Sequence, residues 1–345
     1  KRRIKKSFFY ANFIKYIFYP IYNILWEYLI NFEAKCLFYF WKLKNHDQEY
    51  FNLNNNDKLL IKDDKNFKDL SKKIFDNSLK HLNETKKTLL SEEHRKKMML
   101  VHGKNGTDAT IPYRISLFEK LDENLRKEIV KFASSNKMIS TAANHMKIFP
   151  ILTRIQVSLN IPRENSDLRG AMFWHRDTFG FKNLDFFMYI SDVDDENGPF
   201  YFLKEKIKAS TFMNFENLRP YNLPGERGKV DISEFSKYFS DEKIKKMTGD
   251  SGTAIFLDSF STYHRGGFCK SRDRIVLRFC YQSHDAFYTE PFTKDNQYIY
   301  DKDITDTNVN NRFHKYLFFK KKSKIIKFFL SFLLKFYRRI DFILT

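Results

Sequence analysis

Cysteine is scarce in this sequence, which contains Cys36, Cys269 and Cys280 and no other. Three thiols spread over 345 residues do not make a disulfide framework, and their spacing does not match a CxxC zinc site. The scarcity is typical of a protein that resides in a reducing compartment. We therefore expect a cytoplasmic location.

Long apolar runs are missing as well. From Phe8 to Trp41 the sequence is apolar, but polar residues interrupt it at spacings that are mostly multiples of four, and Pro20 would kink or divide a helix. No run reaches the roughly 18 apolar residues of a spanning helix, and no signal peptide with a compact apolar core is evident. We predict a helix that packs on the domain or lies on a membrane surface.

Acidic residues are few at the two ends of the chain. Of the net charge of +19, residues 1–44 carry +7 (nine Lys/Arg, two Glu) and residues 313–345 carry +8 (nine Lys/Arg, one Asp). The remaining +4 belongs to everything between them. A nucleic-acid-binding protein usually spreads its basic stripe over the folded body, so we do not predict a nucleic-acid partner.

The C-terminal segment 313–345 has the clearest amphipathic pattern. Its basic and polar residues recur every three or four positions and so share one helical face, with Ile, Leu, Phe and Tyr between them: Lys324, Lys327, Ser331, Lys335 and Arg338. Such a helix suits an anionic membrane surface, and the alternative is packing on its own domain or in a dimer. We expect residues 313–345 and 1–44 to contact such a surface, and we predict no oligomeric state.

The sequence changes character at Ile151. Before it come helical patterns, at 67–82, 91–100, 117–134 and 140–146. After it come short segments rich in β-branched and aromatic residues, at 151–160, 185–190, 198–203, 252–258 and 274–282. Helices followed by short strands predict an α+β fold in which a double-sheet jelly roll carries flanking helices.

We expect three regions along the chain. Residues 1–65 form a basic, aromatic-rich N-terminal helical segment, with a polar linker at 46–66 that leads into the domain. Residues 66–312 form the main domain, whose long polar insertion at 205–250 is typical of a lid or binding loop. Residues 313–345 form the basic amphipathic C-terminal helix.

Two segments contain candidate metal ligands. His175 and Asp177 lie two residues apart in a predicted strand, so their side chains share one face. His264 follows a second predicted strand at a glycine turn, from which it can reach that face across a jelly roll. Two imidazoles and one carboxylate form the facial triad of non-haem iron sites, which leaves three coordination positions for a 2-oxo acid and dioxygen.

Three arginines near the last predicted strand could bind a carboxylate of 2-oxoglutarate. Arg274 opens the strand, Arg278 shares its face, and Arg272 precedes it. We favour Arg274 because it lies at the entry of the strand, and all three stay open as candidates.

Three stretches of the sequence, in this order, resemble the phytanoyl-CoA dioxygenase family. The first is Trp174-His175-Arg176-Asp177 with Gly180, and the second is 187–200, which ends in Gly198-Pro199-Phe200. The third is 252–274, which contains Gly252-Thr253-Ala254, His264-Arg265-Gly266-Gly267 and Arg274. The resemblance covers roughly residues 95–290 and leaves out both basic ends. It implies a double-stranded β-helix of the cupin type. It also implies an enzyme that uses dioxygen, with Fe(II) held by His175, Asp177 and His264 and with 2-oxoglutarate held by Arg274.

The expected reaction is hydroxylation, because the carboxylate ligand Asp177 occupies the position that a halide would need for halogenation. The substrate is expected to be a small molecule, a lipid or a lipid-linked compound. Many family members have a Gly-Ser-His-Lys-like turn where this chain has 203–206, Leu-Lys-Glu-Lys, so no relative's substrate can be transferred. A catalytically silent jelly-roll binding protein and a peripheral membrane adaptor are the alternatives.

Overall fold

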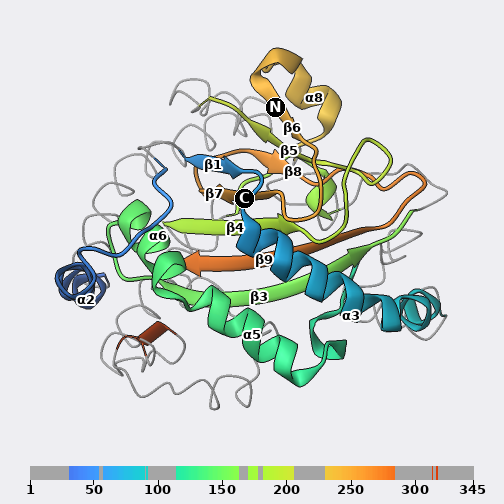
Figure 1. Cartoon of the computed structure of the whole chain (residues 1–345). Helices are drawn as coiled ribbons and strands as arrows, with labels where there is room; N and C mark the ends of the chain where they lie inside the picture. The colour runs from blue at the N-terminus through green and yellow to red at the C-terminus, as the bar shows by residue number, and fades with distance from the viewer. Residues whose placement is uncertain are drawn as a thin grey trace, which may run out of the picture.

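The computed structural model describes residues 31–53, 57–89, 91, 114–162, 170–177, 182–205, 230–283, 313, 316 and 317. Two antiparallel sheets form the centre of the molecule (Figure 1). The six-stranded sheet has the order β1 (Lys58–Ile61), β7 (Ala254–Leu257), β4 (Asn183–Tyr189), β9 (Arg274–Gln282), β3 (Ile151–Asn160) and β2 (Arg114–Ser116). The three-stranded sheet has the order β6 (Ile244–Met247), β5 (Phe200–Leu203) and β8 (His264–Arg265).

The chain crosses repeatedly between the two sheets. It leaves β3 of the large sheet and reaches Trp174 and His175, which bridge to Val230 and His264 beside the small sheet. It then enters β4, passes through β5 and β6, returns in β7, crosses to β8 and ends in β9. This alternation is the winding of a jelly roll, and the predicted fold class, a jelly roll with flanking helices, is confirmed.

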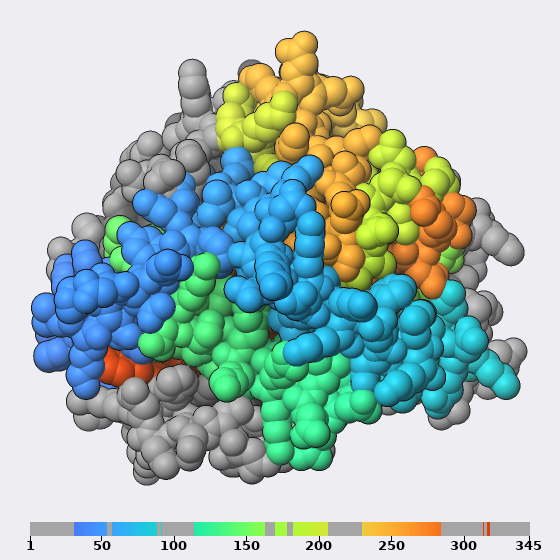
Figure 2. Space-filling model, in the orientation of Figure 1, coloured from blue at the N-terminus to red at the C-terminus, as the bar shows by residue number. Residues whose placement is uncertain are grey.

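Helices cover the outer face of the large sheet, where α3, α5 and α6 lie across its strands (Figures 1 and 2). They are α3 (Lys65–Leu89), α5 (Glu123–Ala133) and α6 (Asn136–Met146), with α2 (Phe32–Lys44) beside α6. The shorter elements are η1 (Phe118–Lys120), η2 (Gly170–Met172), α8 (Ile232–Ser236) and η3 (Asp241–Lys243). Within the described ranges, no helix is long and apolar enough to cross a bilayer.

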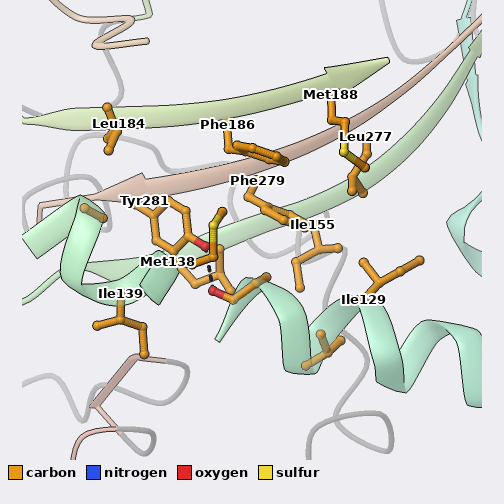
Figure 3. Close-up of a cluster of buried hydrophobic side chains, with 14 of the residues drawn as sticks. Ile129, Met138, Ile139, Ile155, Leu184, Phe186, Met188, Leu277, Phe279 and Tyr281 are labelled. Atoms are coloured by element: carbon orange, nitrogen blue, oxygen red, sulfur yellow. Dashed lines mark hydrogen bonds between the residues drawn. The ribbon is translucent and has the colours of Figure 1, made fainter. Parts of the chain in front are cut away.

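The main core lies between these helices and the large sheet (Figure 3). On β9 every second residue faces the helices, and these residues are Ile275, Leu277, Phe279 and Tyr281. The Phe279 ring stacks on Phe186 of β4 at 5.3 Å, and each such buried side chain contributes about 1.5–3 kcal/mol. The Tyr281 hydroxyl donates to the Ala133 carbonyl at 2.5 Å, which satisfies one of the carbonyls left at the end of α5.

The predicted elements correspond closely to those observed. The strands predicted at 151–160 and 274–282 are β3 and β9, and the helix predicted at 67–82 lies within the longer α3. The 117–134 pattern is η1 followed by α5, and 140–146 lies within α6. Of the predicted helix at 91–100, only Ser91 is among the described residues.

Four strands lie where no strand was predicted, and two of them, β2 and β8, have only three and two residues. β1 falls within the expected linker and pairs with β7 at the edge of the large sheet, where its side chains are only half-buried. β6 falls within the expected insertion 205–250 and pairs with β5. Both are four-residue edge strands, so their apolar alternation is weak. Residues 206–229 lie outside the described part of the chain.

The terminal helices lie largely outside the described residues, which exclude 1–30 and 318–345. The described part of the N-terminal region, α2, packs into the main core through Ala34, Leu37, Phe38 and Trp41. The predicted region boundaries at 65 and 312 remain predictions.

Two glycine turns pack backbone against backbone beside the small sheet. A Cβ on Gly267 would lie 2.4 Å from the Pro199 carbonyl oxygen, and one on Gly198, whose φ is +70°, would lie 2.4 Å from the Phe268 carbonyl carbon. No side chain fits at either position. The Gly-Pro and Gly-Gly pairs seen in the sequence are thus two halves of one contact that holds β5 beside the turn after β8.

We expect Gly267→Ala to lower the free energy of unfolding by about 1–3 kcal/mol, because the added methyl group forces the two turns apart. Urea unfolding would measure it. Gly266→Ala is the matched control, since its nearest atoms lie at 3.6 Å, an ordinary contact distance. Equal stability of the two variants would contradict the packing argument.

Candidate metal centre

His175, Asp177 and His264 converge between the two sheets. One ligand atom from each lies within 4.8 Å of the others. The Nε2 atoms of His175 and His264 lie 3.7 and 3.9 Å from the two carboxylate oxygens of Asp177. The structure thus brings together the three residues that the sequence predicted as ligands, and their roles remain a proposal.

Backbone pairing positions the two histidines. The amide of His175 donates to the carbonyl of His264 at 3.0 Å, and the amide of His264 donates to His175 at 2.9 Å. Residues paired in this way project their side chains to the same face, and the ring centroids lie 4.4 Å apart. Asp177 follows two residues later, where its amide donates to the Ser259 carbonyl at 2.9 Å. The predicted strand around His175 is therefore only a pair of isolated bridges.

Each imidazole is oriented by its own backbone. Nδ1 of His175 lies 2.8 Å from the Phe173 carbonyl oxygen, and Nδ1 of His264 lies 3.0 Å from that of Thr262. A carbonyl only accepts hydrogen bonds, so in the neutral rings Nδ1 carries the proton and Nε2 has the lone pair. Both lone pairs therefore belong to the nitrogens nearest Asp177. The carbonyl groups that hold Nδ1 and the set of two imidazoles and one carboxylate fit a divalent ion such as Fe(II).

Arg278 neutralises the carboxylate of this site from the large sheet. Its Nη2 donates to Asp177 Oδ2 at 2.5 Å and to Asp185 Oδ2 at 2.9 Å. Burial opposes ionisation of Asp177, but the charges of Arg278, His264 and His175 and the Arg278 hydrogen bond hold its pKa well below the usual range. Asp177 is therefore ionised and oriented before any metal binds.

The three candidate arginines have different surroundings. Arg272 is more than half exposed and pairs with Asp194 at the surface, and Arg278 is bound to Asp177 and Asp185. Arg274 is buried, and its Nε has no hydrogen-bond partner among the described residues. It also lines the same cavity as His175 and His264. The role of Arg274 as the carboxylate-binding arginine stays a prediction.

That cavity has a volume of about 90 Å³ and lies between the sheets. Its apolar wall includes Phe187, Phe200 and Val276, and the Phe200 ring lies 5.6 Å from that of His264. Tyr189 also lines it; burial raises the pKa of this phenol to about 12, so the hydroxyl stays protonated and donates to the Met247 carbonyl at 2.7 Å.

The sequence reasoning missed the polar face of β3. Gln156, Ser158 and Asn160 line the cavity, while the alternate residues Ile155, Val157 and Leu159 belong to the main core. The signal was present as polar residues at every second position of a predicted strand. The sequence reasoning also did not predict the ion pair between Arg278 and Asp177, because that pair depends on which strands are neighbours in the sheet.

Comparison with known proteins gives only remote similarities. No protein-family model matches the chain, and no curated protein matches it. A structure of EctD from S. alaskensis with 2-oxoglutarate and 5-hydroxyectoine aligns with 67% of this chain and 73% of its own, at 13% identity and a TM-score of 0.40. A structure of AviO1 from Streptomyces viridochromogenes Tue57 aligns with 62% of this chain and 85% of its own, at 14% identity and a TM-score of 0.36. A structure of SnoN, a non-heme alpha ketoglutarate dependent epimerase from nogalamycin biosynthesis, aligns with 56% of this chain and 76% of its own, at 16% identity and a TM-score of 0.33.

Such low scores establish neither a family nor an activity for this chain. The membership in the phytanoyl-CoA dioxygenase family that the sequence suggested therefore remains a prediction.

Proposed function

We propose that this chain is an Fe(II)- and 2-oxoglutarate-dependent dioxygenase that hydroxylates a small molecule. The observation that carries the proposal is the convergence of His175, Asp177 and His264 beside a cavity that His175 and His264 line together with the buried guanidinium of Arg274. Metal ligands alone would fit many sites. A buried arginine beside them that forms no ion pair with any described residue calls for an anionic cosubstrate, and 2-oxoglutarate combines a metal-chelating end with a distal carboxylate.

Each group of this chain has a definite task in the proposed reaction. Both histidines would present Nε2 to a metal, because their Nδ1 protons are held by carbonyl groups. Arg278 keeps Asp177 ionised and in place, and Arg274 would bind the distal carboxylate of 2-oxoglutarate bidentately. Phe187, Phe200 and Val276 limit access of water to the site. Bound iron, with 2-oxoglutarate as the electron source, would supply the activation of dioxygen.

The first test is anaerobic binding of Fe(II) and 2-oxoglutarate, followed by the visible metal-to-ligand charge-transfer band. We expect the band in the wild type and its loss in His175→Ala, because one of three metal ligands is removed. His145→Ala is the matched control: this half-buried histidine contacts Asp258 at 3.3 Å and does not line the metal cavity. A folded wild-type protein that gives no band would overturn the proposal.

A silent binding protein would form the same band without turnover. Release of succinate from 2-oxoglutarate in air, at a rate that the Asp177→Ala variant lowers by about 10³-fold or more, separates an enzyme from that alternative. A lipid or lipid-linked substrate stays a prediction from the sequence.

For a partner, we infer that an anionic membrane surface binds along α2. One face of this helix is buried in the core, but the opposite face exposes large apolar side chains: Phe32 (64%), Tyr39 (64%), Phe40 (60%) and Leu43 (73%). Lys42 and Lys44 are exposed beside them. An apolar face flanked by lysines suits the boundary between acyl chains and anionic headgroups.

The packing of Phe313 brings the second basic end to the same place. Its ring makes an edge contact with Trp41 of α2 at 5.2 Å, and Lys44 lies over it at 5.7 Å. Figure 2 shows the described C-terminal residues beside the α2 region. Residues 1–44, which carry +7, end in α2, and residues 313–345, which carry +8, begin at Phe313 beside this helix. The net charge of the two segments favours an anionic membrane surface over a neutral partner.

We expect the full chain to co-sediment with phosphatidylserine-containing vesicles and not with pure phosphatidylcholine vesicles, and Phe40→Glu to weaken this binding severalfold. Leu79→Glu on α3 is the control, because Leu79 is also half-exposed but lies on another helix. Equal loss in both variants, or no binding to either vesicle, would contradict the proposal.

A further inference from the structure

A row of polar residues crosses the open end of the large sheet. Arg114 of β2 is paired with Asn160 of β3, and Asn160 is paired with Arg274 of β9. Residues directly opposite one another on neighbouring strands project to the same face. All three line the cavity that also contains His175 and His264. Two guanidinium groups that are 160 positions apart in the sequence therefore face one space, with one asparagine between them.

The two arginines lie at different depths. Arg274 is 7% exposed, whereas Arg114 is an exposed residue on the edge strand β2. The carboxamide of Asn160 donates to the Arg274 carbonyl at 3.3 Å, which ties β3 to the start of β9 between them. Arg274 is therefore positioned for a small cosubstrate bound deep beside the metal ligands. Arg114 is positioned for a second molecule that enters the cavity after the cosubstrate has bound.

Among the residues that the structure describes, the charges around the cavity do not balance without a further anion. Arg278 is bound to two carboxylates, those of Asp177 and Asp185. Within the described ranges, no carboxylate forms an ion pair with Arg114 or Arg274. The three guanidinium groups and a divalent metal bring five positive charges. The two aspartates and the 2-oxoglutarate dianion bring four negative ones, so one positive charge remains.

We propose that the substrate of this site is an anion whose carboxylate, phosphate or sulfate group binds Arg114. This inference rests on the proposed dioxygenase function, because it assigns the second arginine after Arg274 has been assigned to 2-oxoglutarate. The anionic group is held at the mouth by a charge-assisted hydrogen bond. The rest of the substrate then extends inward past Ser158 and Val276 toward His175 and His264.

The test separates Arg114 from Arg274. With Fe(II) under anaerobic conditions, 2-oxoglutarate should bind to Arg114→Gln within about twofold of the wild-type affinity, as judged by the charge-transfer band. Arg274→Gln should lose that affinity. If Arg114→Gln loses it equally, Arg114 is a second anchor for 2-oxoglutarate and the inference is wrong.

The second readout is binding of anionic probes. Acetate, inorganic phosphate and inorganic sulfate are titrated calorimetrically into protein already saturated with Fe(II) and 2-oxoglutarate. We expect one of them to bind the wild type and to bind Arg114→Gln roughly tenfold or more weakly, with partial recovery in Arg114→Lys. Arg272→Gln is the control, because Arg272 is exposed and does not line the cavity.

The outcome distinguishes the two levels of the proposal. A normal charge-transfer band with no probe bound, or with equal binding to wild type and Arg114→Gln, overturns the anionic substrate and leaves the dioxygenase standing. Absence of the band in the folded wild type overturns both. The probe that binds most tightly identifies which anionic group the substrate carries.

Discussion

Replacing Arg278 with methionine should lower the free energy of unfolding of the metal-free protein by about 3–5 kcal/mol. The side chains of Arg278, Asp177 and Asp185 are 14%, 9% and 3% exposed, so removing the cation leaves two buried carboxylates without a counter-charge. Urea unfolding in the presence of a chelator would measure the change. Methionine keeps most of the side-chain volume, so the effect reports charge rather than packing.

Arg272→Met is the matched control for this experiment. Arg272 also pairs with an aspartate, Asp194, but both side chains are 55% exposed. A surface pair of this kind contributes about 0–1 kcal/mol. Similar losses in the two variants would contradict the view that Arg278 neutralises a buried site.

A saturating divalent metal should reduce the difference between Arg278→Met and the wild type, because the ion supplies positive charge to Asp177. If the metal stabilises the two proteins equally, Asp177 does not contact it. The same pair of proteins thus reports on the role of Asp177 without any measurement of turnover.

Arg274→Gln should weaken 2-oxoglutarate binding by about 10²–10³-fold, since the variant loses a buried, charge-assisted pair with the distal carboxylate. Titration of the anaerobic charge-transfer band gives the dissociation constant. Fe(II) binding itself should be unchanged, because Arg274 is not among the converging metal ligands.

Arg272→Gln again serves as the control and should bind 2-oxoglutarate normally, because it does not line the cavity. Wild-type affinity in Arg274→Gln would show that the buried guanidinium serves another purpose. The assignment of 2-oxoglutarate as cosubstrate would then lose its main support.

Much of the fold was predictable because it depends on local pattern. β3 and β9 alternate between residues that face the main core and residues that face the cavity, so their apolar period of two is visible in the sequence. The helices α3, α5 and α6 are amphipathic and were predicted for the same reason. The strands β1, β2, β6 and β8 were not, since two to four residues carry too little alternation to be recognised.

The sequence by itself determined the candidate ligands and a short list of arginines. His175 and Asp177 stand two residues apart, and His264 lies just before a pair of glycines that indicates a turn. It could not separate Arg274 from Arg278 by pattern, because the two lie on one face of one strand, two strand periods (four residues) apart.

Only the tertiary structure shows how the surroundings of these two arginines differ. The pairing of β4 with β9 places Asp185 beside Arg278, and the crossing between sheets brings Asp177 to it, so this guanidinium is already neutralised. The pairing of β2, β3 and β9 places Arg114 and Arg274 in one row with no acid between them. Charge compensation is a property of neighbours across strands, and these neighbours are far apart in the sequence.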